Sequence, residues 1–173
     1  MNLFDAVNNR TSYRDGYTDK PVTREVLGKI MEAGLAAPSG CNKQTTSLIA
    51  VDDAAAVSQI KSLLASSMRA VDTAPAFICV LTERVIAYGD KCFAVQDYSA
   101  AIQNMLLAIV ASGCESCWIE GYVTGDDNIG RQIADMLGVP AELDLVCVLP
   151  VGYAAMPVRR VAKKPFDARA KFV

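Results

Sequence analysis

Apolar residues recur with helical spacing in several stretches of the chain, and shorter continuous apolar runs separate these stretches. The clearest stretch follows Thr23, a suitable N-cap residue, and places apolar side chains on one face as far as Leu35. The same spacing predicts further helices at about Leu3–Asn8, Asp53–Ser66, Asp90–Ser112 and Asp126–Leu137. Apolar positions of the 90–112 stretch continue almost all round, which is typical of a helix buried centrally or against a partner.

The short apolar runs predict four buried strands between these helices, at Thr46–Val51, Ala76–Leu81, Glu115–Glu120 and Asp144–Val151. No internal repeat, low-complexity tract or linker interrupts the alternation. The pattern therefore predicts a single α+β domain over residues 1–173, with an irregular arm from Ala154 onward.

The composition mainly excludes classes of function. The chain of 173 residues is 52% hydrophobic and 21% charged with a net charge of −2, which favours neither nucleic acid nor an acidic membrane surface as partner. It contains no histidine, so Ser-His-Asp and Cys-His nucleophiles and histidine metal sites are excluded. Its six cysteines follow no secretory signal pattern, and we interpret them as reduced thiols of a cytoplasmic protein. No apolar stretch is long enough to span a bilayer.

Three segments carry candidate chemistry, and each has a plainer structural explanation. In an extended segment Arg10, Ser12 and Arg14 point the same way, which suits an anion such as phosphate or simply forms the polar face of a strand. Residues 37–44 are rich in turn formers, which suits either a flat polar ligand or a helix-to-strand turn. Residues 116–121 end in Gly121, which lets backbone approach a ligand or merely ends a buried strand.

The arm is strongly basic compared with the rest of the chain. Its last fifteen residues hold six basic side chains against one acid, Asp167, for a local charge of +5. Such a run is commonly a solvated tail, although it also suits an anionic ligand.

Taken in order, these segments resemble the FMN-dependent nitroreductase family, as a short, single-domain member. The resemblance rests on six ordered motifs: Arg-x-Ser-x-Arg at 10–14, Ala-Pro-Ser-x-x-Asn-x-Gln at 37–44, Gln-Asn-Met-Leu-Leu-Ala at 103–108, Ser-Cys-Trp-Ile-Glu-Gly at 116–121, Leu-Gly-Val-Pro at 137–140 and Val-Gly-Tyr at 151–153. The match is collinear from residue 3 to the arm.

The resemblance implies a nitroreductase-like α+β fold, in which helices flank a central, mainly antiparallel sheet and two subunits form an intertwined homodimer with FMN at the interface. It also implies an enzyme that takes hydride from NADH or NADPH and passes it through flavin N5 to a nitroaromatic, quinone or enone by a ping-pong mechanism. The partners are then a second copy of the chain and a small-molecule acceptor. The arm, residues 154–173, would contact the partner subunit and the flavin phosphate.

Carried over position by position, the resemblance assigns three groups of residues to the flavin. The phosphate would be held by Arg10, Thr11, Ser12, Arg14 and, from the arm, Lys163 and Lys164 ahead of Arg159 and Arg160. The ring would be lined by Pro38, Ser39 and Asn42, with Arg69 near N1 and C2=O. The backbone of Ile119, Glu120 and Gly121 would lie beside the ring with amides directed at N5 and O4, which makes Glu120 and Gly121 the catalytic positions. No metal site is predicted.

The sequence departs from the family pattern in three places. Thr45 and Thr46 follow Gln44, where family members commonly have Pro-Trp, and Ser66 stands where some members offer an asparagine to the flavin. Little room remains between Leu81 and Asp90 for the helical excursion by which larger members cover the flavin.

Two other functions remain open from the sequence. The Thr45-Thr46 departure suggests a protein that binds or senses flavin without turnover. Cys114 and Cys117 have the Cys-x-x-Cys spacing of a thiol redox or metal module, although a helix C-terminus beside them would raise a thiol pKa.

Overall fold

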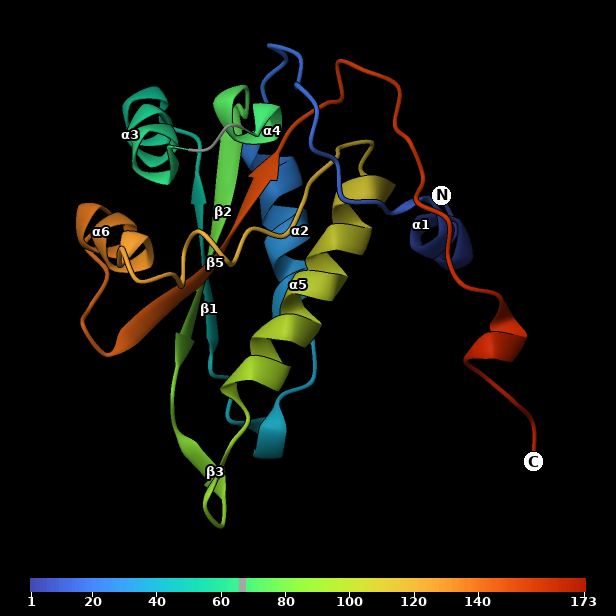
Figure 1. Cartoon of the computed structure of the whole chain (residues 1–173). Helices are drawn as coiled ribbons and strands as arrows, with labels where there is room; N and C mark the ends of the chain where they lie inside the picture. The colour runs from blue at the N-terminus through green and yellow to red at the C-terminus, as the bar shows by residue number, and fades with distance from the viewer. Residues whose placement is uncertain (66–67) are drawn as a thin grey trace.

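A three-stranded antiparallel sheet lies at the centre of the fold in the computed structural model, which describes residues 1–65 and 68–173 (Figure 1). The middle strand β2 (Ala76–Glu83) pairs with β1 (Thr46–Val51) on one side and β5 (Leu143–Val151) on the other. Both pairings are antiparallel, and β2 is buried on both faces. The predicted α+β fold with a mainly antiparallel sheet is therefore confirmed.

Helices cover both faces of this sheet, as Figure 1 shows. On one face α2 (Arg24–Leu35) and α5 (Ala94–Ala111) pack against a cluster that includes Ile78 and Val80 of β2. On the other face α3 (Ala54–Leu64) and α6 (Ile129–Met136) pack against Phe77 and Cys79 of the same strand. Successive strand residues point to opposite faces, so β2 serves both clusters.

Side-chain caps start the helices near the predicted positions. In α1 (Leu3–Asn9), Asn2 forms a capping box with Asp5. Thr23 caps α2 as predicted, because its hydroxyl accepts the amide hydrogen of Val26. Asp53 caps α3, which ends at Leu64; Ser66, the predicted last residue of that helix, lies outside the described residues.

The connection after β2 differs from the prediction. A short hairpin of β3 (Ile86–Tyr88) and β4 (Lys91–Cys92) turns at Gly89, whose φ is +58°. The long helix α5 therefore begins at Ala94 rather than Asp90. Three-residue strands carry too little periodic signal to be separated from an adjoining amphipathic helix.

Three further parts of the secondary structure also differ from the prediction. Residues 115–120, predicted as a strand, touch β5 and its extension only through isolated bridges, Glu115 with Gly152 and Ile119 with Val148. The one-turn helix α4 (Arg69–Asp72) was not predicted. The helix α6 begins at Ile129 rather than at about Asp126, because Asn128 before it has a left-handed backbone conformation with a φ of +52°.

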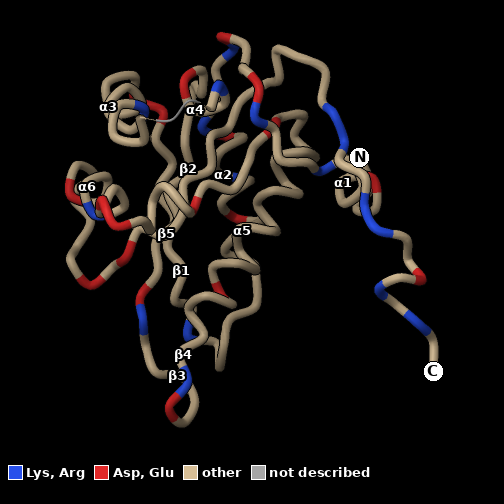
Figure 2. The backbone as a smooth tube through the Cα atoms, viewed as in Figure 1, with Lys and Arg blue, Asp and Glu red and all other residues tan. Residues whose placement is uncertain are grey.

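The arm is extended except for a 3₁₀ turn at Phe166–Ala168 and runs back beside α1. A hydrogen bond from Thr11 Oγ to the carbonyl of Arg159, 3.3 Å long, fixes its first part. Figure 2 shows basic residues spaced along the arm and in the segment after α1 that it passes. Within residues 1–65 and 68–173, no helix combines the length and the apolar character needed to cross a membrane.

Candidate functional site

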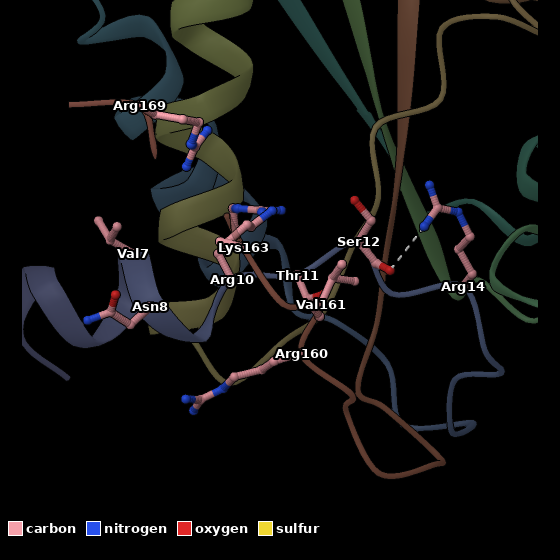
Figure 3. A pocket seen from close by; sticks show the side chains of 10 residues that line it. All are labelled: Val7, Asn8, Arg10, Thr11, Ser12, Arg14, Arg160, Val161, Lys163 and Arg169. Atoms are coloured by element: carbon pink, nitrogen blue, oxygen red, sulfur yellow. Dashed lines mark hydrogen bonds between the residues drawn. The ribbon is translucent and has the colours of Figure 1, made fainter. Parts of the chain in front are cut away.

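Basic side chains line a cavity of about 470 Å³ between the segment after α1 and the arm (Figure 3). The segment contributes Arg10 and Arg14, together with the hydroxyl residues Thr11 and Ser12. The arm contributes the remaining basic residues, which are Arg160, Lys163 and Arg169. The cavity therefore gathers five cations and two hydroxyls from regions about 150 residues apart, an arrangement suited to a multiply charged anion.

Tyr13, buried under the segment after α1, connects that segment to the start of the arm by hydrogen bonds. Its ring is buried, its amide donates to the carbonyl of Ser116 over 3.0 Å, and its hydroxyl donates to the carbonyl of Gly16 over 2.6 Å. The same hydroxyl accepts the amide hydrogen of Met156 at 3.2 Å, which fixes the start of the arm. Because alternate side chains of an extended segment point apart, burying Tyr13 turns Ser12 and Arg14 outward. Sequence periodicity offered no sign of this role.

Of the six residues first expected to hold a phosphate, all but Lys164 line this cavity. The cavity is lined by Arg10, Thr11, Ser12, Arg14 and Lys163. Lys164 is exposed and is not among the lining residues. Arg160, ranked below the two lysines from the sequence, and Arg169, not singled out at all, do line it. Because the arm is irregular, no sequence periodicity indicates which of its side chains face the cavity.

A carboxyl group lies beside this basic cavity. Burial raises the pKa of Glu115 to about 7, and the charge of Arg10 opposes that shift. One carboxylate oxygen of Glu115 is buried and, in the part of the chain that the structure describes, has no hydrogen-bond partner. Protonation of Glu115 would remove a negative charge near Arg10 and so make the electrostatic potential of the cavity more favourable for an anion.

The segment 115–121 leads away from the cavity along β5. Ile119 donates its amide hydrogen to the carbonyl of Val148 and accepts one in return, at 3.2 and 2.9 Å. Its amide is thus engaged in the fold and, contrary to the expectation from the resemblance, is not free to point at a ligand. The amides of Glu120 and Gly121, in contrast, donate to no backbone acceptor among residues 1–65 and 68–173. These two adjacent donors are available to a ligand.

The side chain of Glu120 is held from both sides. Tyr98 of α5 donates its hydroxyl hydrogen to Oε1 over 3.1 Å, and Trp118 donates its indole N–H to Oε2 over 2.9 Å. Burial and the nearby Glu120 raise the pKa of Tyr98, so the phenol stays protonated and remains a donor. The glutamate side chain therefore fixes the backbone on which the two available amides lie.

Arg69 starts α4, next to the turn that follows Arg14. The amide of Ala70 donates to the carbonyl of Arg14 over 3.2 Å, and a Cβ on Gly16 would lie 3.6 Å from the Arg69 guanidinium. The helix is further placed by Met68, whose sulfur lies 3.7 Å from that of Cys117. Arg69 thus lies on the side of the protein that carries the basic cavity. Ser66, which stands where some members of the family offer an asparagine, lies outside the described residues.

Pro38, Ser39 and Asn42 lie elsewhere, at the opposite end of α5. The amide of Gly40, in the 3₁₀ turn Gly40–Asn42, donates to Asp97 in the first turn of α5. Tyr13 by contrast bonds to Ser116, beyond the C-terminal end of the same helix. Eighteen residues of α-helix extend over about 27 Å. One chain therefore does not bring this loop and the basic cavity together.

Cys114 and Cys117 do not have the surroundings of a reactive pair. Both thiols are free and buried. Burial raises the pKa of Cys117 to about 11 and also raises that of Cys114, which disfavours the reactive thiolate. Within the described ranges, no three His, Cys, Asp or Glu side chains are grouped to hold a metal ion. The geometry therefore opposes a thiol redox or metal centre here.

The structure thus combines an antiparallel sheet between two helical layers with a basic cavity and, farther along the 115–121 segment, two available amides. These features define an α+β protein with a candidate site for an anionic ligand. The family model of the Nitroreductase family matches residues 7–84 and 64–153. The chain thus belongs to the nitroreductase family.

Proteins of this family and fold resemble the chain in sequence, in structure or in both. An FMN reductase [NAD(P)H] of Bacillus subtilis is 29% identical over 180 residues, covering 93% of this chain and 69% of its own. A nitroreductase with bound FMN from Bacteroides fragilis is 26% identical, has a TM-score of 0.77 and is aligned over 100% of this chain and 99% of its own. A BluB-like flavoprotein from Clostridium difficile has a TM-score of 0.86 at 20% identity, over 100% and 99% of the two chains, and shares the fold.

Proposed function

We propose that the protein transfers hydride from NADH or NADPH, by way of bound FMN, to a nitroaromatic, quinone or enone acceptor in a ping-pong cycle. The chain is an oxidoreductase of the nitroreductase family that uses FMN and NAD(P)H. The identity of the acceptor and the order of the two half-reactions are the parts that we propose.

The observation that carries the proposal is the composition of the basic cavity. The FMN phosphate carries close to two negative charges at neutral pH, and Arg10, Arg14 and Lys163 offer charge-assisted hydrogen bonds to it. Ser12 adds a hydroxyl donor. The residues present therefore fit the phosphate end of FMN.

The ring end is served by the segment that leads from this cavity. When bound, FMN supplies the reversible hydride acceptor, which no amino-acid side chain can supply. The chain's part is to position and polarise it: the available amides of Glu120 and Gly121 suit the acceptor atoms of the ring edge. The guanidinium of Arg69 would favour negative charge on the pyrimidine side of the ring.

A second copy of the chain completes this site in the proposal. Pro38, Ser39 and Asn42 would line the flavin held by the partner, because α5 separates them from the basic cavity of their own chain. Leu3 and Phe4 of α1 are 65% and 76% exposed, and Phe166 in the arm is 61% exposed. Apolar side chains left in water support an intertwined homodimer that covers them.

Two features of composition bear on the cycle. The chain contains no histidine, so the acceptor would take its proton from water or from another group. All six cysteines are free, which supports a cytoplasmic, reducing environment.

Spectroscopy of the purified protein reconstituted with FMN tests the proposal. We expect a bound flavin spectrum that bleaches anaerobically on adding NADH or NADPH and returns on adding a quinone or nitroaromatic. A protein that neither binds FMN nor is reduced contradicts the proposal. Bound flavin that is reduced but not reoxidised by any acceptor identifies the non-turnover alternative. Elution from a sizing column at the mass of two chains tests the homodimer.

A further inference from the structure

The loop of residues 38–45, which the proposed function places against a flavin, has a strained backbone. Cys41, Asn42 and Gln44 have φ values of 51°, 54° and 51°, in the left-handed region that residues with a Cβ rarely adopt. Three such residues in four positions persist only where the surrounding structure holds them. Backbone strain of this kind collects at ligand-binding segments and requires an identifiable anchor.

Asp97 is that anchor. Its side chain is buried, with 4% of the residue exposed, and each carboxylate oxygen accepts a hydrogen bond from one end of the loop. Oδ1 accepts the amide hydrogen of Gly40 at 2.7 Å, and Oδ2 accepts the hydroxyl hydrogen of Thr45 at 2.8 Å. The strained residues lie between these two contacts. The amide contact is short for an N–H donor, as expected of a charge-assisted hydrogen bond, and the hydroxyl contact has the ordinary length for an O–H donor.

The loop has little freedom to leave this position. A Cβ on Gly40 would lie 2.4 Å from a ring carbon of Phe93, so the turn rests directly on the N-cap residue of α5. Within the loop, the hydroxyl of Ser39 accepts the amide hydrogen of Gln44 at 2.9 Å. Thr45 itself is buried, with 5% exposed, so its hydroxyl has no access to water as an alternative partner.

The resemblance noted from the sequence leads one to expect proline at the position of Thr45. Proline has neither a hydroxyl nor an amide hydrogen, so it cannot make the contact that Thr45 makes. In this chain, threonine at this position supplies a hydroxyl for the buried carboxylate.

We propose that Asp97 and Thr45 are positioning residues that lock the 38–45 loop in its strained conformation and thereby present Ser39 and Asn42 to the flavin of the partner subunit. This inference rests on the proposed function. Neither residue touches the reacting atoms, and both act through the loop. Loss of the lock releases the loop and weakens flavin binding while the sheet stays folded.

A matched set of threonine variants of the full-length protein tests the lock. Thr45→Val removes the hydroxyl with little change of shape, and Thr45→Ser restores it. Thr82→Val is the control, because the hydroxyl of Thr82 is also buried but has no hydrogen-bond partner among the described residues. Hydrogen exchange of peptides covering 38–45, measured without FMN, reports the lock, and fluorescence titration with FMN reports its use.

We expect Thr45→Val to exchange its loop amides at least tenfold faster than wild type and to bind FMN about five- to tenfold more weakly. Thr45→Ser and Thr82→Val should behave as wild type in both measurements. Equal exchange in Thr45→Val and wild type overturns the lock. Faster exchange with unchanged FMN affinity overturns the positioning role.

A second variant guards against a folding defect in the first. Asp97→Asn keeps the size of the side chain and removes its charge, and we expect the same direction in both measurements. Failure of wild type to bind FMN contradicts the proposed function, whereas the exchange measurement still decides whether the lock exists.

Discussion

The hydroxyl of Tyr98 lies 3.1 Å from Oε1 of Glu120 and joins the start of α5 to the segment that carries the two available amides. Trp118 completes the contact on the other carboxylate oxygen. A carboxylate held by two donors has few ways to move, so the backbone at Glu120 and Gly121 is fixed by the fold before any ligand arrives.

Tyr98→Phe is expected to lower the rate of flavin reduction about five- to tenfold. A hydrogen bond to a charged acceptor contributes about 1.5–3 kcal/mol, and Trp118 still holds the other carboxylate oxygen, so only part of this energy reaches the reaction. The measurement is anaerobic stopped-flow reduction of FMN-loaded protein by NADPH. Tyr17→Phe is the control, since it removes a buried phenol hydroxyl that, among the described residues, donates to the carbonyl of Pro150 and not to Glu120. An unchanged rate in Tyr98→Phe would show that Glu120 needs no such support.

Arg10→Ala is expected to weaken FMN binding roughly 10- to 100-fold, because a charge-assisted hydrogen bond to phosphate is lost. Riboflavin, which has no phosphate, should bind wild type and variant equally. Fluorescence titration with both ligands separates a phosphate contact from a general defect. Arg24→Ala breaks an exposed ion pair with Asp52 and should alter neither affinity. Equal losses for FMN and riboflavin would argue against the phosphate assignment.

The arm offers a neighbouring pair of lysines for comparison. Lys163 lines the basic cavity and Lys164 does not. Lys163→Ala should therefore weaken FMN binding by roughly three- to tenfold, as one exposed cation is lost from the phosphate, whereas Lys164→Ala should change it less than about twofold. The same titration ranks the two variants, and the reverse order would show that the arm moves when FMN binds.

Glu115 makes the stability of the protein depend on pH. Burial raises its pKa from an ordinary value of 4.5 to about 7, so the folded state binds its proton more tightly than the unfolded chain does. The stabilising contribution is complete below about pH 4.5 and is lost as the pH rises through about 7. After allowance for solvent screening of a half-exposed group, the loss is about 1 kcal/mol.

Glu115→Gln should remove this dependence. Urea unfolding at pH 5 and pH 8 is expected to show that the wild type loses about 1 kcal/mol more than the variant between the two values. Glu142→Gln removes an exposed carboxylate and serves as the control for net charge. Parallel curves for wild type and Glu115→Gln would show that the carboxyl group remains solvated.

The sequence predicted the long periodic elements and not the short ones. Thr23 and Asp53 lie at helix starts because their side chains satisfy free amides, a local effect that the sequence records. The β3–β4 hairpin and the one-turn helix at Arg69 are too short for periodicity, and tertiary contacts decide them. Residues 115–120 read as a strand, yet only isolated bridges form there.

In the candidate site, too, local features could be predicted from the sequence and long-range features could not. Alternation along an extended segment predicted that Arg10, Ser12 and Arg14 would share a side. All three line one cavity, and Thr11 between them lines it as well. The sequence did not single out Arg169 or the role of Tyr13, and it ranked Arg160 below Lys163 and Lys164. Burial beneath the segment and the path of an irregular arm are long-range properties. The engaged amide of Ile119 could not be foreseen, because it depends on the bridge to Val148.

Asp97 and Tyr98 are neighbours in the chain, although the carboxylate of one serves the 38–45 loop and the hydroxyl of the other serves Glu120. Successive helical residues are rotated by about 100° about the axis, so a single peptide unit directs two side chains to two different segments. Inserting or deleting one residue at the start of α5 would turn both away together. A change of length in the β3–β4 hairpin should therefore be tolerated better than one in the junction between Phe93 and Tyr98.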